Sequence, residues 1–471
     1  MRVTIDELDA EGRGVGPSED GRLRVHVAGA LPGEKVRAHV EHRSPHAAVA
    51  WASLVALDGA PSPDRVAPVC PGAGRCGGCS LQHLRYGAQL AYKRARLARA
   101  LARAGVAPAP VAEVVASPRT TGYRNKAKYV LADAHGALAY GSWGPGTHHF
   151  VDMAGCRVPE EPIDAVAAAA VRALRESGLQ PYDERARTGE LRYLVVRAGA
   201  GGRVLVVVVA RSAAGRDALA AAARRLGAAR PEVAGVLLNV NDTEGGAILG
   251  TEEHVLCGAT ELADQVGEVP LRLGARTFFQ VNRAQASALY AAVVHAAMPP
   301  AGARVAGAAG AEPVRALDLY CGAGAIALSL ARAGARVAGV ERAGPAVEDA
   351  RRSARAAGLA ERTTFVEGDA AGGLAETARA MGGVDVVVVN PPRQGLGADV
   401  REALAVAAPP RLVYVSCGPE SLAADLAVLA GRGYALLPPL QPFDLLPGTP
   451  HVEAVATLVR RGAATPGAGG R

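Results

Sequence analysis

The sequence predicts an α/β protein that begins with a small β-barrel. In the last third of the 471-residue chain, apolar runs of strand length alternate with helical segments, as in βα units built around a parallel sheet. Residues 1–60 instead alternate short β-like runs with glycine-containing turns, which is typical of a small antiparallel barrel of the OB-like kind. We therefore expect a barrel over 1–62, a central α/β domain over 63–275, a C-terminal α/β domain over 276–462 and a disordered tail over 463–471.

The first βα unit of the C-terminal part carries a glycine-bearing turn. An apolar strand ends at Tyr320 and leads into Cys321-Gly322-Ala323-Gly324, and a helix is expected from about 326 to 332. Glycines in such a turn let the backbone approach a ligand closely. The next strand, 336–341, ends in Glu341, at about the place where dinucleotide-binding folds put the carboxylate that binds ribose hydroxyls. This combination predicts a Rossmann-like domain with an adenosine-containing ligand.

The type of turn separates the candidate cofactors. It holds two glycines and lacks the GxGxxG pattern that cradles a pyrophosphate, so S-adenosylmethionine fits better than NAD. A plain βα turn without a ligand is the structural alternative, and the acid at 341 favours the cofactor.

A rigid polar loop follows the strand expected at 385–389. Asn390 precedes two prolines, which stiffen the loop and leave the asparagine amide beside the cofactor and the incoming substrate. An aromatic residue after the prolines would suggest methylation of an amino group, because its ring would stack on the base. Arg393 stands there instead, which weakens that reading, and a rigid strand-exit turn is the structural alternative.

A thiol and a carboxylate accompany the last two strands. Cys417 follows the apolar strand 412–416, where a lone cysteine is more often an inert core residue than a nucleophile. His451 and Glu453 change that expectation, since they lead into the strand 453–460 and an i, i+2 pair in extended chain shares one face. Uracil C5 accepts a methyl group only after a thiolate has added at C6, and a base must then remove the C5 proton. A thiol and a separate base, here Cys417 and Glu453, are therefore what methylation of uracil C5 requires.

On these motifs, the chain resembles the RNA 5-methyluridine (uracil-C5) methyltransferase family, and most closely its ribosomal-RNA branch, which has an N-terminal TRAM domain and an iron–sulfur cluster. The resemblance covers nearly the whole chain. It implies S-adenosylmethionine-dependent formation of 5-methyluridine in RNA, with 23S ribosomal RNA as the expected target and transfer RNA as the alternative. It implies that Cys417 attacks C6, that Glu453 removes the C5 proton and that Asp444 supports the active site. The implied cofactor contacts are Gln280, Tyr320, Gly322, Glu341, Asp369 and Asn390.

Two positions depart from the family pattern. The family usually has Asp where this chain has Asn390, and usually has Asn after the nucleophile, where this chain has Gly418. Asparagine keeps an acceptor oxygen for the ammonium group of the cofactor but loses the negative charge. The departure therefore bears on cofactor affinity more than on chemistry.

Four of the seven cysteines form a second group, with three close together and one far downstream: Cys70, Cys76, Cys79 and Cys156. Such a group binds a metal or forms disulfides, and in a reducing cytoplasm four thiolates indicate iron–sulfur or zinc. The three-plus-one spacing favours a [4Fe–4S] cluster over zinc, and the family resemblance implies such a cluster. Cys257 and Cys321 are expected to be small buried thiols.

Charge is consistent with an anionic partner. The formal net charge is +7, although only four of the 52 basic residues are lysines and a GC-rich genome accounts for part of the arginine excess. An amphipathic helix over 81–105 carries Arg96, Arg99 and Arg103 on one face, and 122–129 interleaves tyrosines with basic residues. These basic residues fit two interpretations: contact with RNA phosphates and bases, or a merely solvated face. The barrel is likewise either a structural cap or an RNA-binding TRAM module.

The N-terminus lacks an apolar signal region, and the longest strongly apolar run, 204–210, is too short to span a bilayer. We expect a soluble, cytoplasmic monomer without a membrane partner. Two rival functions stay open: a non-catalytic RNA-binding or assembly factor that retains the cofactor fold, and a nucleic-acid amino-methyltransferase.

Overall fold

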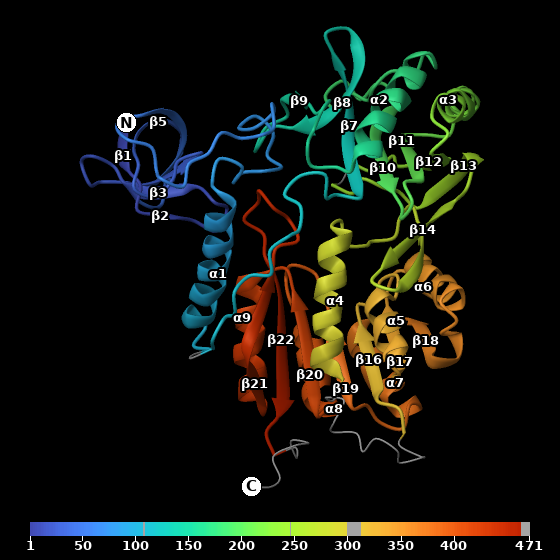
Figure 1. Cartoon of the computed structure of the whole chain (residues 1–471). Coiled ribbons are helices and arrows are strands. Elements are labelled where there is room, and N and C mark those ends of the chain that lie inside the picture. The colour runs from blue at the N-terminus through green and yellow to red at the C-terminus, as the bar shows by residue number, and fades with distance from the viewer. Residues whose placement is uncertain (107–108, 245, 299–311, 463–471) are drawn as a thin grey trace.

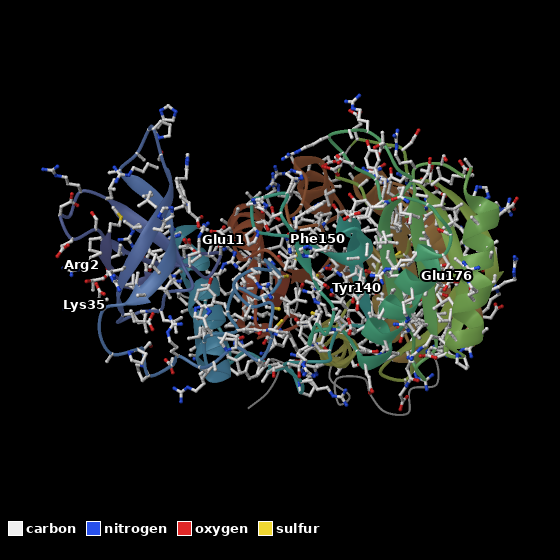
Figure 2. The ribbon with its side chains drawn as sticks, turned by 90° about the horizontal axis from the view of Figure 1, so that it is seen from above. Arg2, Glu11, Lys35, Tyr140, Phe150 and Glu176 are labelled. Carbon is white, nitrogen blue, oxygen red and sulfur yellow. The ribbon has the colours of Figure 1, made fainter. Side chains whose placement is uncertain are left out.

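The computed structural model describes residues 1–106, 109–244, 246–298 and 312–462. The N-terminal barrel stands at one end of the molecule, and the central domain lies above the C-terminal domain (Figure 1). Seen from above in Figure 2, Arg2 and Lys35 mark the barrel end, and Glu176 marks the far side of the central domain. The tail expected at 463–471 lies outside the described residues. Within the described ranges, no helix is both long and apolar enough to cross a membrane.

The barrel is a six-stranded sheet in the order β1-β5-β6-β4-β3-β2. Its interior is filled by small apolar side chains such as Val25, Val27 and Val36, which alternate with outward polar residues as a half-buried strand requires. The strands are β1 Arg2–Thr4, β2 Glu7–Leu8, β3 Gly14–Pro17, β4 Arg24–Ala28, β5 Lys35–Arg43 and β6 Val49–Leu57.

One pairing in the barrel corrects the expected antiparallel arrangement. β4 and β6 are parallel, with Val25 opposite Ala50, whereas β5 and β6 form an antiparallel hairpin. The reason is that the chain after β4 crosses over before it enters β5, so β6 returns between the two in the direction of β4. The alternation of short strands and turns does not specify which strands become neighbours.

The central domain holds a seven-stranded sheet in the order β13-β12-β11-β10-β7-β8-β9, with α2 and α3 packed on one face. β14 and β15 form a separate hairpin that packs against α6 (Gly344–Ala356) of the C-terminal domain. The elements are β7 Lys126–Ala134, β8 Ala137–Trp143, β9 Phe150–Asp152, α2 Glu161–Arg175, β10 Leu191–Ala198, β11 Val204–Ala210, α3 Arg216–Ala229, β12 Val233–Val240, β13 Glu252–Gly258, β14 Glu261–Val266 and β15 Val269–Gly274.

The C-terminal sheet has the order β18-β17-β16-β19-β20-β22-β21. The first five strands are parallel, and β22 is antiparallel to both β20 and β21. The elements are α4 Arg283–Ala297, β16 Arg315–Leu319, α5 Ala325–Arg332, β17 Arg336–Glu341, α6 Gly344–Ala356, a short 3₁₀ turn Ala360–Arg362, β18 Thr363–Glu367, α7 Ala370–Ala380, β19 Val386–Val389, α8 Ala398–Ala407, β20 Arg411–Ser416, α9 Pro419–Gly431, β21 Tyr434–Phe443 and β22 Glu453–Arg460. The predicted α/β, Rossmann-like domain is confirmed.

The strand order reverses at β16, which lies between β17 and β19. Open α/β sheets bind their ligands at such a switch point, outside the carboxyl ends of the strands. The fold therefore places the candidate site where the turn after β16, the end of β17 and the loop after β19 meet.

Helix α1 (Tyr86–Arg103) joins the N-terminal half to this sheet. It packs against α9, with Leu97 and Leu101 buried in the same core as β20 and β22. The chain that follows runs beside β21, where Val111 bridges to Leu440. In Figure 1, α1 accordingly lies alongside the red part of the sheet rather than within the central domain.

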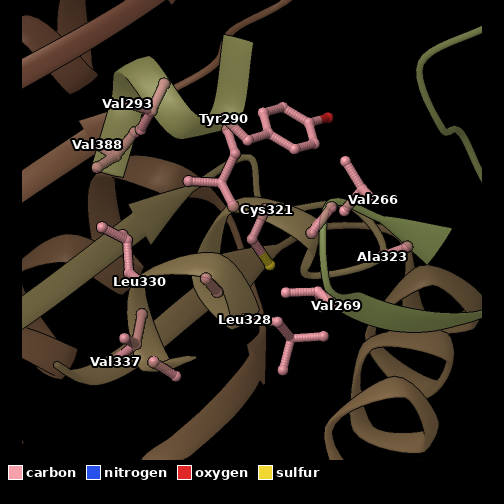
Figure 3. Packing of buried hydrophobic residues seen from close by; sticks show 14 of the residues in the cluster. Val266, Val269, Tyr290, Val293, Cys321, Ala323, Leu328, Leu330, Val337 and Val388 are labelled. Carbon is pink, nitrogen blue, oxygen red and sulfur yellow. The ribbon is translucent and has the colours of Figure 1, made fainter. Parts of the chain in front are cut away.

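Cys321 lies in the core of the C-terminal domain. Figure 3 shows its side chain among Val269, Leu328 and neighbouring apolar residues. It is 8% exposed, and burial raises the pKa of its thiol well above the ordinary value. This confirms the expected buried thiol at 321, whereas Cys257, which was also expected to be buried, is only half-buried.

Candidate active site and cysteine cavity

A cavity of about 780 Å³ lies at the carboxyl ends of the parallel strands, a volume in the range of small-molecule sites. The eight residues expected to act in catalysis or cofactor binding all line it, although they come from seven separate segments. They are Gln280, Tyr320, Gly322, Glu341, Asp369, Asn390, Cys417 and Glu453.

The turn after β16 is shaped by left-handed backbone. Tyr320, Gly322 and Gly324 have φ of 62°, 52° and 77°. Gly324 also needs the absence of a side chain, because a Cβ there would lie 2.9 Å from the ring of Phe365. This conformation starts α5 and leaves the turn's backbone open to the cavity.

The carboxylate of Glu341 is fixed against this turn. It accepts hydrogen bonds from the Gly322 amide at 3.1 Å and from the Ala343 amide at 2.9 Å. Each carboxylate oxygen has a second lone pair, so both can still accept from hydroxyl groups such as those of a ribose. Glu341 is thus held in place before any ligand arrives.

Asp369 stands at the N-terminus of α7, where its Oδ1 accepts from the amides of Ala371 at 3.0 Å and Gly372 at 2.9 Å. These backbone hydrogen bonds lower the pKa of the exposed carboxyl. Its charge therefore persists at the mouth of the cavity through the neutral pH range.

Two neutral amides complete the cofactor side. Asn390 leaves β19, and its own backbone amide donates to the Leu319 carbonyl at 3.3 Å. Gln280 is buried on the loop before α4, and its backbone carbonyl accepts from Asn125 at 3.1 Å. A residue of the central domain thus helps to fix a cavity residue of the C-terminal domain.

The thiol of Cys417 is half-buried. Burial is the main cause that raises its pKa, the nearby Glu453 raises it further, and the Arg393 guanidinium lowers it. The thiol form consequently predominates at neutral pH in the unliganded protein. Arg393 is the neighbouring cation that favours the thiolate.

Glu453 is 8% exposed, and burial raises its pKa to about 7, with Arg393 opposing the shift. A carboxylate with that pKa is suited to take up a proton at neutral pH. His451 differs, because burial and then the charges of Arg393 and Arg96 lower its pKa to about 4. The imidazole is therefore neutral, and its Nε2 lies 3.3 Å from the Arg393 guanidinium.

Two residues near the site have positions that the sequence did not indicate. The sequence pattern indicates for Arg393 only that it replaces an aromatic ring, yet the guanidinium lies near Cys417, Glu453 and His451. Its place directly after a stiff Pro-Pro exit was the available signal. Asp444 does not line the cavity: it is fully buried and pairs with Lys93 at 2.5 Å.

The arginine face of α1 is only partly free. Arg96 pairs with Glu420 at 2.9 Å and donates to the Pro450 carbonyl at 3.0 Å. Arg99 and Arg103 line a groove of about 450 Å³ between α1 and the barrel, together with Arg24. Of the predicted stripe, Arg96 thus serves the fold, Arg99 pairs with Glu7 of the barrel at 3.8 Å, and Arg103 is exposed.

The four grouped cysteines meet at a second cavity of about 90 Å³, although Cys156 is far from the others in sequence. Burial raises the pKa of Cys79 to about 11, Arg124 opposes that shift and the Cys156 and Cys76 sulfurs add to it. None of the four forms a disulfide. Four sulfur donors fit an iron–sulfur or zinc site in type and number. Among the residues that the structure describes, however, these side chains are not placed as a group that could hold a metal ion.

Comparison with known proteins agrees with this geometry. Residues 316–408 match the family described as "Methyltransferase domain", and residues 380–461 match "tRNA (Uracil-5-)-methyltransferase". An uncharacterized RNA methyltransferase of Geobacter sulfurreducens is 36% identical over 98% of this chain and 90% of its own length. One from Halalkalibacterium halodurans is 35% identical over 97% of this chain and 96% of its own.

A solved structure also matches the full length. The tRNA (uracil-54, C5)-methyltransferase of Pyrococcus abyssi, in complex with S-adenosyl-L-homocysteine, superposes with a TM-score of 0.74 at 26% identity. The match covers 98% of this chain and 100% of that one. The chain therefore belongs to the RNA uracil-5-methyltransferase family and is an S-adenosylmethionine-dependent RNA methyltransferase.

Proposed function

We propose that this protein forms 5-methyluridine in RNA, with 23S ribosomal RNA as its substrate. The observation that carries the proposal is the shared cavity: a half-buried thiol, a buried carboxyl with a pKa near 7 and the cofactor-side residues all line it. A thiol, a separate base and a nucleoside-type site are the parts that C5 methylation requires.

On the cofactor side, Glu341 would hold the ribose hydroxyls and Asp369 would contact the adenine. The rest of the binding surface would come from Gln280, Tyr320, Gly322 and Asn390, which line the same cavity. S-adenosylmethionine, when bound there, supplies an electrophilic methyl group. With Asn390 in place of a carboxylate, the cofactor's ammonium group is held by an acceptor oxygen without an opposing charge.

On the substrate side, the target uridine must leave its stack to reach the cavity, which suits a loop or bulge in folded RNA. The Cys417 thiol loses its proton to solvent and its sulfur bonds to C6 of uracil, while the electron pair of the C5–C6 double bond moves toward O4. Arg393 favours the thiolate because its positive charge lies beside the sulfur. In the resulting enolate C5 is the nucleophile: it bonds to the methyl carbon while the methyl–sulfur bond breaks, and the electron pair of that bond stays on the departing S-adenosylhomocysteine.

Glu453 acts last. Its carboxylate takes the C5 proton, the electrons of that C–H bond restore the C5–C6 double bond, and the C6–S bond breaks to return the thiolate to Cys417. Burial suits Glu453 to this role because it raises the carboxyl's affinity for a proton.

The four cysteines hold a [4Fe–4S] cluster in this proposal, and the barrel is a TRAM module that binds RNA. The type and number of donors support the cluster, since the four cysteines line one cavity together with Arg124, Lys126 and Lys128. Such a cluster would fasten the loop around Cys76 to the distant Cys156, and the methyl transfer described above needs no redox step.

Incubation with labelled S-adenosylmethionine and, separately, ribosomal and transfer RNA tests the proposal. Label in 5-methyluridine after digestion of ribosomal RNA to nucleosides is the expected result. Label in transfer RNA alone would move the target to the RNA class named for the Pyrococcus relative. Label in N-methylated adenosine or guanosine would indicate amino-methylation, and stoichiometric RNA binding without any transfer would indicate an assembly factor.

A further inference from the structure

The residues between β21 and β22, 444–452, form a loop that leads directly into Glu453. In Figure 1 this red loop rises from the sheet toward the chain that follows the barrel. It begins with the buried Asp444 and passes His451 before it reaches Glu453. Contacts that fix this loop therefore also fix the position of Glu453, the proposed general base.

The N-terminal half of the chain holds the loop by its backbone. Leu446, Pro447 and Pro450 each offer a carbonyl, and Gly448 offers both its amide and its carbonyl. Side chains donate to three of these carbonyls: Lys93 to Leu446 at 3.1 Å, Tyr123 to Pro447 at 3.1 Å and Arg96 to Pro450 at 3.0 Å. The Gly448 carbonyl accepts from the Leu81 amide at 2.8 Å. The Gly448 amide donates to the Gln89 side chain at 2.8 Å. The active-site loop is thus held by residues more than 300 positions away in sequence.

Lys93 is the charged member of this set. Its side chain and that of Asp444 are both 0% exposed, and Nζ lies 2.5 Å from Asp444 Oδ1. Burial lowers the pKa of Lys93 and the Asp444 carboxylate opposes that shift. A buried cation bonded to Asp444 and to the Leu446 carbonyl fixes two points of the loop at once, because a displaced charge would lose both partners without water to replace them.

We propose that Lys93 is a positioning residue for the reaction: through Asp444 and Leu446 it sets the course of the 444–452 loop and so presents Glu453 to the C5 proton. The inference rests on the proposed function of Glu453. Lys93 itself lines no part of the cavity, so its effect passes through the loop. Cofactor binding depends on other segments and should not depend on Lys93.

Lys93→Met is the direct test, with Lys35→Met as the matched control because Lys35 is exposed on the barrel. At saturating RNA, kcat of Lys93→Met should fall roughly 10- to 100-fold, the scale for a misplaced catalytic group. The dissociation constant for S-adenosylmethionine should stay within about twofold of wild type. Because proton removal is the last step, the steady-state fraction of protein covalently bound to methylated RNA should rise. The control should keep a kcat near that of wild type.

A second variant separates positioning from stability. Loss of one partner leaves Asp444 charged, buried and unpaired, which can prevent folding, whereas replacing both partners by apolar residues is often tolerated. Lys93→Met/Asp444→Leu should therefore fold, bind the cofactor and still show slow turnover with accumulated adduct. Wild-type turnover in this double variant would overturn the inference. If wild-type protein itself made no 5-methyluridine, the proposed function would fail instead.

Discussion

Ser416 of β20 lies directly opposite Ala454 of β22 in the antiparallel pair that completes the C-terminal sheet. Cys417 follows the one residue and Glu453 precedes the other, so this single pairing brings the thiol and the carboxyl to one edge of the sheet. A parallel strand in the place of β22 would have sent Glu453 to the opposite edge. The antiparallel insertion of β22 is thus what brings these two residues to one cavity.

The order of bond making gives the first prediction. Cys417→Ala should bind RNA and cofactor but transfer no methyl group, because C5 becomes nucleophilic only after the sulfur has added at C6. In Glu453→Gln, the Cys417 sulfur should still add to C6 and the methyl group should still be transferred to C5. The C5 proton then stays, so the sulfur cannot leave. A methylated RNA attached to Cys417 should then survive denaturing gel electrophoresis.

Wild-type protein with 5-fluorouridine RNA provides the control for this trap, because fluorine cannot leave as a cation to a base. The same type of adduct is expected. Methylation of C5 by Cys417→Ala, or the absence of adducts both with Glu453→Gln and with fluorinated RNA, would show that the nucleophile is misassigned.

The raised pKa of Glu453 predicts a pH-dependent stability. The folded protein keeps this carboxyl protonated up to about pH 7, whereas in the unfolded chain it ionises near its ordinary value of 4.5. Its contribution is therefore present in full below about pH 4.5 and is lost as the pH rises through about 7. Glu453→Gln should accordingly be more stable than wild type at pH 8 by roughly 2–3 kcal/mol, since one pKa unit corresponds to about 1.4 kcal/mol.

Urea unfolding of both proteins at pH 5 and pH 8 measures this effect. The difference between variant and wild type should grow from pH 5 to pH 8. An equal difference at both pH values would mean that Glu453 ionises in the folded protein much as it does in the unfolded chain.

Glu341 gives a prediction on the cofactor side. Glu341→Ala should weaken S-adenosylmethionine binding by about 1.5–3 kcal/mol, the scale for hydrogen bonds to a charged group, and leave RNA affinity nearly unchanged. Glu367→Ala is the matched control, because Glu367 ends the adjacent strand β18 but does not line the cavity. Calorimetry that found the cofactor affinity of Glu341→Ala intact would remove Glu341 from the ribose site.

The parts of the site that sequence can predict are those written in short motifs. The turn at Gly322, the acid at 341 and the cysteine at 417 each follow a buried strand, and parallel strands bring their carboxyl ends together. The Lys93–Asp444 pair could not be predicted in this way, because 351 positions separate the two residues and a lone lysine on a helix predicts only a solvated charge. The parallel β4–β6 pairing was missed for a similar reason, since strand neighbours depend on the crossover and not on local pattern.

The four-cysteine cavity supplies the last prediction. Protein purified without oxygen should be brown, with broad visible absorbance and about four irons per chain, as a cysteine-ligated cubane requires. Cys76→Ser should lose most of the iron together with solubility and RNA binding, because the loop around Cys76 then loses its link to Cys156. Cys257→Ser is the matched control: Cys257 lies on β13 and does not line the cavity, so its iron content should equal that of wild type. Colourless protein with one zinc per chain would indicate a structural zinc site and no cluster. Full activity of iron-free Cys76→Ser would show that the loop keeps its place without any metal.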